Sequence, residues 1–553
     1  MSERVLDTTV SINGRAIVSG LFSALLVFAV GCGDSSSESE SDSSADTEAT
    51  SDATPTTSAG PASGTETEGN SNTDPTNGET EGQTTGDGDG DGDGDGDGDG
   101  DGDGDGDGDG DGDGDGDGDG DGDGDGDGDG DGDGDGDGDG DGDPCVEEPG
   151  SPECCADQPE HPSCEPIEPC EPGDGMGGGG MVDKSYLWVA NSNQHTISKV
   201  DTLTVVELAR YRSGPPGEAG NPSRTAVSAD GRFAVVANRQ SGRVTAFAAN
   251  VDDCIDRNNN NTIETSQNPG DIRNWNGNDI NSAEDECIVW STVLPKSNDH
   301  IGAGPRGMTW TLGTWDYDSC SFVNPYVWVG YRPSVGVARM AKLNGATGDV
   351  EEEVEINPWN NGQTTWGPYG AALDYNFETQ EELVYFTALR GQVYRIDGDN
   401  NVDIWAGPNN MQAYGMTVDP EGRVWTGGCS GPVTRFDPEN QQFTTVPNTQ
   451  SCYRGVGADT IGNVWVASNG QCGVVQIDRD TASVVQFHTL NPCSTPVGIS
   501  VDIEGFVWVV DQNQGAWKID PADPQNKEFL PISGNHYTYS DMTGGQIQNI
   551  VPQ

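Results

Sequence analysis

The chain has 553 residues, with 95 acidic against 25 basic residues and a formal net charge of −70. Fifty of the acidic residues lie between Gly33 and Gly180, a stretch without Lys or Arg, so the charge belongs mainly to the N-terminal third. Residues 181–553 are also acidic overall, which excludes nucleic acid and anionic lipid headgroups as partners held by charge. This second part is long enough to form one large hydrophobic core.

Residues 1–31 predict a signal peptide. Arg4 and Arg15 precede an apolar run at 16–30, and small residues then lead to Cys32. The pattern resembles a bacterial lipoprotein signal, in which this cysteine is lipidated, although Ala29 stands where Leu is usual. The run is short for a stable membrane span. We expect a lipid anchor in the cell envelope, at the outer membrane facing outward, with an ordinary secretory signal as the alternative.

Residues 32–144 predict a disordered stalk. Their first part is rich in Ser, Thr and Glu, and from Asp87 to Asp143 every odd-numbered residue is Asp and every even-numbered one is Gly. Flexible Gly and dense negative charge favour an extended, solvated tether. Gly-Asp repeats that bind calcium also carry a periodic apolar residue, which is missing here, so we expect loose counterion condensation.

The cysteines indicate an oxidising compartment. Without Cys32, twelve of the 13 cysteines remain, an even number in an exported chain. Five of them lie in a Pro-rich segment, which predicts a stapled linker at 145–180. The sequence leaves the pairing of six cysteines open: Cys145, Cys154, Cys155, Cys164, Cys170 and Cys320.

Residues 181–553 contain a repeat that predicts an all-β, seven-bladed β-propeller. Residues 414–425, 454–465 and 497–508 are near copies, each with an Asp, a Gly and a Trp at the same spacing. A β-rich unit of about 40 residues buries its faces by stacking on copies of itself. Strand runs separated by turn residues give seven blades: 186–210, 223–294, 306–356, 369–406, 414–446, 453–489 and 496–532.

The first blade lacks an innermost strand, and the C-terminus is expected to supply it. Residues 536–541 can be laid over 454–459 of the repeat. Pairing of this strand with residues 187–189 would close the ring and remove its exposed sheet edges.

Two disulfides follow from the repeat. Cys429 and Cys472 lie between the second and third strands of their blades, whereas Cys452 and Cys493 precede the first strand of the next blade. These loops emerge on one face, so Cys429 is expected to pair with Cys452 and Cys472 with Cys493.

An insertion at 252–287 predicts a structural calcium site on the face opposite the ring mouth. Residues 256–267 follow the EF-hand loop pattern, with Asn261 for the turn Gly and Gln267 for the final Glu. A carboxylate from Asp271, Asp285 or Glu286 would complete the shell, and a Cys254–Cys287 disulfide would bring the last two close. An Asn-rich loop without metal is the alternative. The expected ligands are Asp256, Asn258, Asn260, Thr262, Glu264, Asp285 and Glu286.

The repeat resembles the propellers of the streptogramin B lyases and of NHL-type proteins, most closely at 414–520. This resemblance implies the propeller fold, a scaffold that carries lyases, lactonases and binding modules. The lyases need a His at the start of a first strand and a metal-linked Glu about 14 residues on. Here the resemblance places His536 and Asn191 at these positions, so a non-catalytic protein is favoured over an enzyme.

The starts of the innermost strands suggest a ligand-binding mouth. We expect the residues there to face one well and to bind a carboxylate-bearing or sugar-like ligand, or alternatively to fill the channel and bond to loop carbonyls. The expected function is therefore binding of a ligand or surface protein through the loop face, with a metal-dependent lyase or lactonase in the central well as the alternative. The mouth residues are Arg224, Arg306, Tyr369, Tyr414, Arg454 and His536, with Val497 completing the ring.

Overall fold

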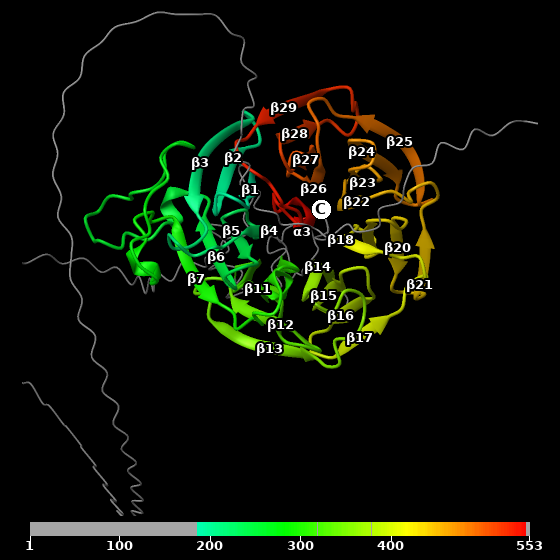
Figure 1. Ribbon diagram of the computed structural model, residues 1–553, viewed down its shortest axis with the longest axis horizontal. Helices are drawn as coiled ribbons and strands as arrows, with labels where there is room; N and C mark the ends of the chain where they lie inside the picture. The colour runs from blue at the N-terminus through cyan, green and yellow to red at the C-terminus, as the bar shows by residue number, and fades with distance from the viewer. Residues whose placement is uncertain (1–184, 318, 378, 549–553) are drawn as a thin grey trace, which may run out of the picture. The chain divides into compact units, whose positions relative to one another are not determined.

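The described part of the chain is a seven-bladed β-propeller. A computed structural model describes residues 185–317, 319–377 and 379–548; the expected signal peptide, stalk and Cys-rich linker, including Cys32, lie outside these ranges. Seven sheets stand around a common axis, as Figure 1 shows. No helix within these ranges is long and apolar enough to cross a bilayer.

Each blade is an antiparallel sheet whose strands follow in chain order from the axis outward. A small hairpin, β9 (Thr314–Asp316) and β10 (Ser321–Val323), interrupts the third blade between its first two strands. The blades agree closely with the predicted ranges: β1 (Tyr186–Asn191), β2 (Thr196–Asp201) and β3 (Val206–Arg212); β4 (Pro222–Val227), β5 (Phe233–Asn238), β6 (Arg243–Ala248) and β7 (Ile288–Val293); β8 (Met308–Trp310), β11 (Tyr326–Ser334), β12 (Val337–Asn344) and β13 (Val350–Ile356); β14 (Pro368–Asn376), β15 (Glu381–Ala388), β16 (Val393–Ile396) and β17 (Val402–Trp405); β18 (Ala413–Val418), β19 (Val424–Gly428), β20 (Thr434–Asp437) and β21 (Gln442–Thr445); β22 (Tyr453–Ala458), β23 (Asn463–Ser468), β24 (Gly473–Asp478) and β25 (Ser483–Thr489); β26 (Pro496–Val501), β27 (Val507–Asp511), β28 (Gly515–Ile519) and β29 (Lys527–Pro531).

The repeated Asp and Trp form one buried hydrogen bond. In the sixth blade the Trp465 indole donates to Asp459 Oδ2 at 2.8 Å, and the other oxygen of Asp459 accepts the backbone N–H groups of Ile461 and Asn463. The fifth and seventh blades repeat the indole bond at the same distance, from Trp425 to Asp419 and from Trp508 to Asp502. The carboxylate therefore fixes the turn between the first two strands and satisfies a buried indole.

The repeated Gly allows neighbouring innermost strands to approach closely. A Cβ atom on Gly415 would lie 2.4 Å from the carbonyl oxygen of Arg454, and one on Gly455 would lie 2.6 Å from that of Val497. Real Cβ atoms do not come so near a backbone oxygen, so the glycine is required by packing between blades.

The C-terminal segment 535–542 closes the ring beside β1. The backbone N–H of Trp188 donates to the Met542 carbonyl at 2.9 Å, and that of Ser192 donates to the Asn535 carbonyl at 2.7 Å. The segment thus runs antiparallel to β1 in the innermost position, as expected, but with too few ladder bonds to be a regular strand.

The start of this closing segment lies one residue out of the expected register. Ser192 bonds to Asn535 as Asn469 bonds to Cys452 in the sixth blade. His536 therefore takes the position of Tyr453, and Tyr537 takes the position of Arg454, which the overlay had given to His536.

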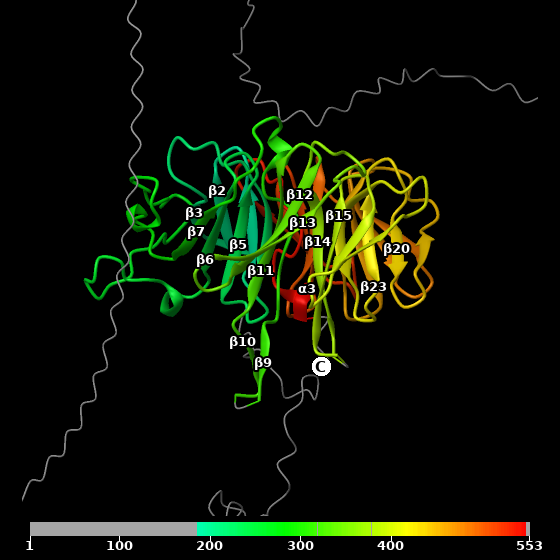
Figure 2. The same ribbon diagram turned by 90° about the horizontal axis from the view of Figure 1, so that it is seen from below.

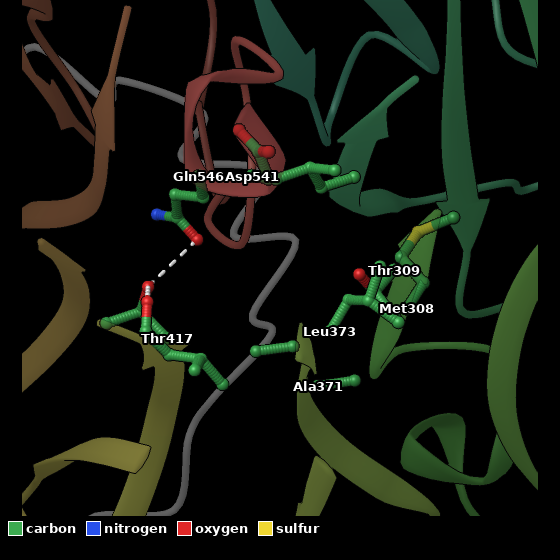
Figure 3. Close-up of a pocket in the computed structure, with 10 residues that line it drawn as sticks. Met308, Thr309, Ala371, Leu373, Thr417, Asp541 and Gln546 are labelled. Atoms are coloured by element: carbon green, nitrogen blue, oxygen red, sulfur yellow. Dashed lines mark hydrogen bonds between the residues drawn. The ribbon is translucent and has the colours of Figure 1, made fainter. Parts of the chain in front are cut away.

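Beyond the closing segment, the chain enters the end of the channel away from the ring mouth. The short helix α3 (Gly545–Gln548) lies there, at the lower edge of the side view in Figure 2. A small pocket beside it has room for about one water molecule. Asp541 and Gln546 line this pocket together with Thr417, which donates to the Gln546 side chain at 3.3 Å (Figure 3).

The insertion between β6 and β7 packs along the rim of the ring. Its Ser266 hydroxyl accepts the backbone N–H of Arg210 in β3 at 3.1 Å, and the Arg212 side chain donates to the Arg273 carbonyl at 3.2 Å. The expectation that the insertion hangs from the opposite face is wrong, because it covers the outermost strand of the first blade instead. This packing protects a sheet edge that would otherwise be exposed.

Asp541 gives the closing segment a pH dependence that can be measured. Burial raises the pKa of Asp541 to about 6, although Thr543, Gly544 and Ser500 donate to its Oδ1. Its Oδ2 is buried and has no hydrogen-bond donor in the described part of the chain. The folded chain therefore holds this proton more tightly than the unfolded chain, so the contribution to stability is full below about pH 4 and is lost as pH rises through about 6.

We predict that Asp541→Asn removes this loss. Its free energy of unfolding relative to the parent should increase by up to about 3 kcal/mol between pH 4 and pH 7.5, since the amide stays neutral. Urea unfolding of both proteins at the two pH values measures this change, and the other titrating groups cancel in the comparison. An equal difference between the proteins at both pH values would contradict the assignment.

Candidate functional site

A cluster of arginines and tyrosines fills the mouth of the channel, where the innermost strands begin. We call it the mouth cluster, and Arg454 at its edge is half-buried while the other side chains are buried. Blades two to six contribute five of the residues and the closing segment contributes two. The members are Arg224, Arg306, Arg454, Tyr369, Tyr414, Tyr537 and Tyr539.

The guanidinium groups lie against the aromatic rings. The Arg224 Cζ atom is 3.0 Å from the centroid of Tyr539 and 4.7 Å from that of Tyr369. Arg306 lies 4.6 Å from the Tyr369 ring, and Arg454 lies 5.5 Å from the Tyr414 ring. Cation–π attraction compensates part of the cost of burying these charges.

The phenol groups form a hydrogen-bonded network at the centre of the cluster. Tyr539 donates to the Tyr369 hydroxyl at 2.8 Å, and the Tyr369 and Tyr537 hydroxyls lie 3.2 Å apart. Tyr414 also bonds to Tyr537. Burial raises the pKa of Tyr414 and of Tyr539 well above the usual value, so the phenols stay neutral.

Five of the six expected mouth residues meet in the mouth cluster, and His536 does not. The His536 ring is fully buried beside β1, with Nδ1 2.7 Å from Asn191 Oδ1 and Nε2 2.8 Å from the Ile532 carbonyl oxygen. Sequence reasoning missed Tyr537 and Tyr539, because a shift of one residue exchanges the side chains that face the channel. The shift was not visible in the repeat, since residues 536–541 match it only loosely.

The two residues that the resemblance assigned to the lyase pair, His536 and Asn191, are both engaged inside the fold. His536 and Asn191 do lie opposite each other, as the resemblance implied, but the Asn191 side chain donates to Thr196 and Ser198. Asn191 offers a neutral amide where the lyases have a carboxylate.

Two disulfides brace the loops around the mouth. Cys429 pairs with Cys452 and Cys472 pairs with Cys493, as the repeat predicted. The Asn469 backbone N–H also donates to the Cys452 carbonyl at 3.0 Å, which joins two neighbouring loops of this face. These loops, at 429–432, 449–452, 469–472 and 491–495, form what we call the mouth face.

The insertion adopts much of the geometry of a calcium loop. The third expected disulfide, Cys254–Cys287, closes it. The Asp256 carboxylate accepts the backbone N–H groups of Asn260 and Asn261 at 3.2 and 2.8 Å, and Asn261 has a φ of 63°, the left-handed conformation expected at the turn position.

The remaining expected ligands of the insertion surround this turn without meeting at one point. The Glu264 carboxylate accepts from the amides of Asn258 and Asn260 at 2.8 Å each, and Thr262 donates its backbone N–H to Asn260. Asp285 accepts from Thr265 and Ser266, Glu286 from the backbone of Arg257 and Glu264, and Asp271 from the backbone of Gln267. Among the described residues, the one group of three acidic, His or Cys ligand atoms lying within 4.8 Å of one another is Cys472, Cys493 and Asp511, where both cysteines are in a disulfide.

Comparison with known proteins gives matches to solved structures and to nothing else that was compared. No family model and no curated protein matches the sequence. Similar solved structures include virginiamycin B lyase from Staphylococcus aureus, at 15% identity and a TM-score of 0.40, with 59% of this chain and 92% of that chain covered. A streptogramin B lyase has 16% identity and a TM-score of 0.41, covering 59% and 87%. AztD from Citrobacter koseri has 10% identity and a TM-score of 0.40, covering 64% and 96%.

These matches include the lyases that the repeat resembles. At such identities and TM-scores they add nothing to the fold that the seven sheets show directly, and they carry no argument about activity.

Proposed function

We propose that the chain is a lipid-anchored protein of the cell envelope that binds a ligand or a surface protein through its mouth face, without catalysis. The observation that carries this proposal is the bracing of the mouth face by Cys429–Cys452 and Cys472–Cys493. Loops held in one conformation lose little entropy on binding, so they are suited to recognition.

The charged side chains beneath the loops support the same proposal. Arg224, Arg306 and Arg454 provide planar groups of donors, and the tyrosines provide hydroxyls and rings. Such a cluster matches the carboxylate-bearing or sugar-like ligand that the sequence suggested.

A metal-dependent lyase or lactonase in the central well is the second candidate. The repeat resembles the lyase propellers. However, the two residues that the resemblance assigned to the lyase His and Glu, namely His536 and Asn191, favour binding over catalysis. Both nitrogens of His536 face acceptors inside the fold, and Asn191 provides no carboxylate to hold a metal or to accept a proton. A route to elimination or ring opening would therefore need other residues.

Photo-crosslinking on intact cells tests the mouth face. Gln471 and Ile461 are exposed residues of one blade, in the β23–β24 loop on the mouth face and in the β22–β23 loop on the opposite face. A photoreactive amino acid at position 471 should give a discrete crosslinked species, and the same group at 461 should give none.

Equal crosslinking at both positions, or crosslinking from 461 alone, would contradict binding through the mouth face. Incubation of the purified protein with quinupristin and a divalent metal tests the other candidate, because the structure of a catalytically inactive virginiamycin B lyase holds this compound. Ring opening of quinupristin would favour the lyase.

The anchor is tested separately. Cys32→Ser should leave the membrane fraction and lose labelling by a radioactive fatty acid, because the thiol that carries the lipid is gone. Equal labelling of the parent and the variant would refute the lipid anchor. Protease treatment of intact cells, in which an outward-facing propeller is digested, reports the orientation.

A structural calcium ion in the insertion is part of the proposal. The support is the turn at 256–261, which brings the oxygen-bearing side chains of Asp256, Asn258 and Asn260 close to Glu264. The Asn258 and Asn260 amides, which now donate to Glu264, would have to turn their oxygens toward the ion. Asp285 and Glu286 hold the loop backbone and would shape the site from behind.

We predict that calcium raises the stability of the parent by about 1 to 3 kcal/mol at about 10 mM, as expected for a site of extracellular affinity. Asp256→Ala should lose most of this gain, whereas Asp523→Asn, an exposed carboxylate elsewhere, should keep it. Thermal unfolding of the three full chains measures the effect, and the Asp-Gly stalk contributes equally to all. If calcium stabilised Asp256→Ala as much as the parent, the insertion would be an Asn-rich loop without metal.

A further inference from the structure

The mouth cluster places three guanidinium groups around a few phenols. A guanidinium keeps its charge at any pH that a protein tolerates. The tyrosines next to them stay neutral, because burial raises the pKa of Tyr414 and Tyr539. The charged neighbours that act on these two phenols are arginines, and the remaining neighbours are other tyrosines. The cluster therefore carries net positive charge inside a domain whose sequence is acidic.

Arg224 has an incomplete hydrogen-bond environment. It is fully buried, and its Nη1 donates to the Ser223 carbonyl at 3.0 Å. Its Nε and Nη2 atoms are also buried and have no acceptor among the residues that the structure describes. Unpaired donors on a buried charge cost several kcal/mol, so a fold that keeps them needs an acceptor from another source.

Arg454 reaches a neutral acceptor rather than a carboxylate. When the Asn469 amide is turned so that it donates to the Pro496 carbonyl, its oxygen accepts from Arg454 Nε at 2.9 Å and from Nη2 at 3.1 Å. Neither Arg224 nor Arg454 takes part in the ion pairs found among the described residues. Within 185–317, 319–377 and 379–548, therefore, no carboxylate neutralises these two charges directly.

We infer that the mouth cluster binds a small anion at the propeller axis, held by Arg224 Nε and Nη2 and by the neighbouring phenols. This inference deepens the proposed function. It rests on that function in one respect: both place binding at the mouth face. Guanidinium N–H groups and phenolic O–H groups are donors without competing negative charge, which is the chemistry that anions require. Because Arg224 is fully buried, the anion that we infer is small: a halide or a single carboxylate group.

The anion would link ligand binding to ring closure. Tyr537 and Tyr539 belong to the closing segment, whereas Arg224 and Arg306 belong to the second and third blades. An ion that bonds to both groups favours the closed ring over the open one, because it binds to the folded arrangement and not to the separated ends.

Thermal unfolding of the full chain tests the inference. In a buffer at constant ionic strength, made up with methanesulfonate as a bulky anion that carries no carboxylate, replacement by bromide should raise the melting temperature and then saturate. Replacement by acetate in a second series shows whether a carboxylate is accepted as well. A gain with bromide alone assigns a halide site, and a gain with acetate shows that the carboxylate of a larger ligand can use the same donors.

Two variants separate a specific site from a general salt effect. Arg224→Gln should lose the saturable gain and should match or exceed the parent in stability without bromide, because it removes a buried charge. Arg339→Gln, which loses a partly exposed ion pair with Glu353 on the rim, should keep the whole gain. The same gain in Arg224→Gln as in the parent would overturn the inference.

Bromide located in crystals of the parent by anomalous scattering gives a result that does not depend on folding of the variants. A bromide within hydrogen-bonding distance of Arg224 Nη2 is expected. Bromide on the surface alone, with none at the axis, would overturn the inference, whatever the crosslinking at position 471 shows about the partner.

Discussion

The closure of the ring at its first blade is the constraint on which the rest of the structure depends. Six blades take all four strands from consecutive chain, but the first takes three from its start and a segment from the C-terminus. Without this segment, the inner edge of β1 would lack backbone partners and the gap between the last and second blades would open. Tyr537 and Tyr539 arrive with the same segment, so the mouth cluster is complete only when the ring is closed.

The repeat allowed the fold to be predicted because its residues meet the same packing and hydrogen-bonding requirements in each blade that carries it. Asp459 and Trp465 recur because a buried indole needs an acceptor, and Gly455 recurs because two backbones meet there. The mouth could be predicted less well. Arg224 occupies the place where other blades have this Gly, pairing with Ala237 as Gly498 pairs with Val510. It reaches the cluster from a different strand register. No local sequence pattern predicts this replacement of Gly by Arg.

The rim and the mouth show two ways in which this chain uses polar residues. The insertion satisfies its carboxylates with backbone and hydroxyl donors, so Asp285 is buried with several partners. The spacing of its residues predicted the turn, but not that the insertion lies along β3, since this depends on contacts distant in sequence. The mouth cluster instead gathers cations with aromatic rings. That concentration of donors, under loops braced by disulfides, supports our proposal that recognition takes place at this end of the propeller.

Hydrogen exchange at the closure reports directly whether the C-terminal segment is an integral part of the ring. The Trp188 and Ser192 amides donate to the closing segment. The Asn463 and Val466 amides lie in the sixth blade, which is built from continuous chain, and serve as the reference. If the C-terminal segment is an integral part of the ring, the Trp188 and Ser192 amides should exchange only by global unfolding, as slowly as core amides of the sixth blade such as that of Val466. Exchange of these two amides at the rate of exposed loops, while the sixth blade stays protected, would show that the ring is open at its first blade and would contradict this account.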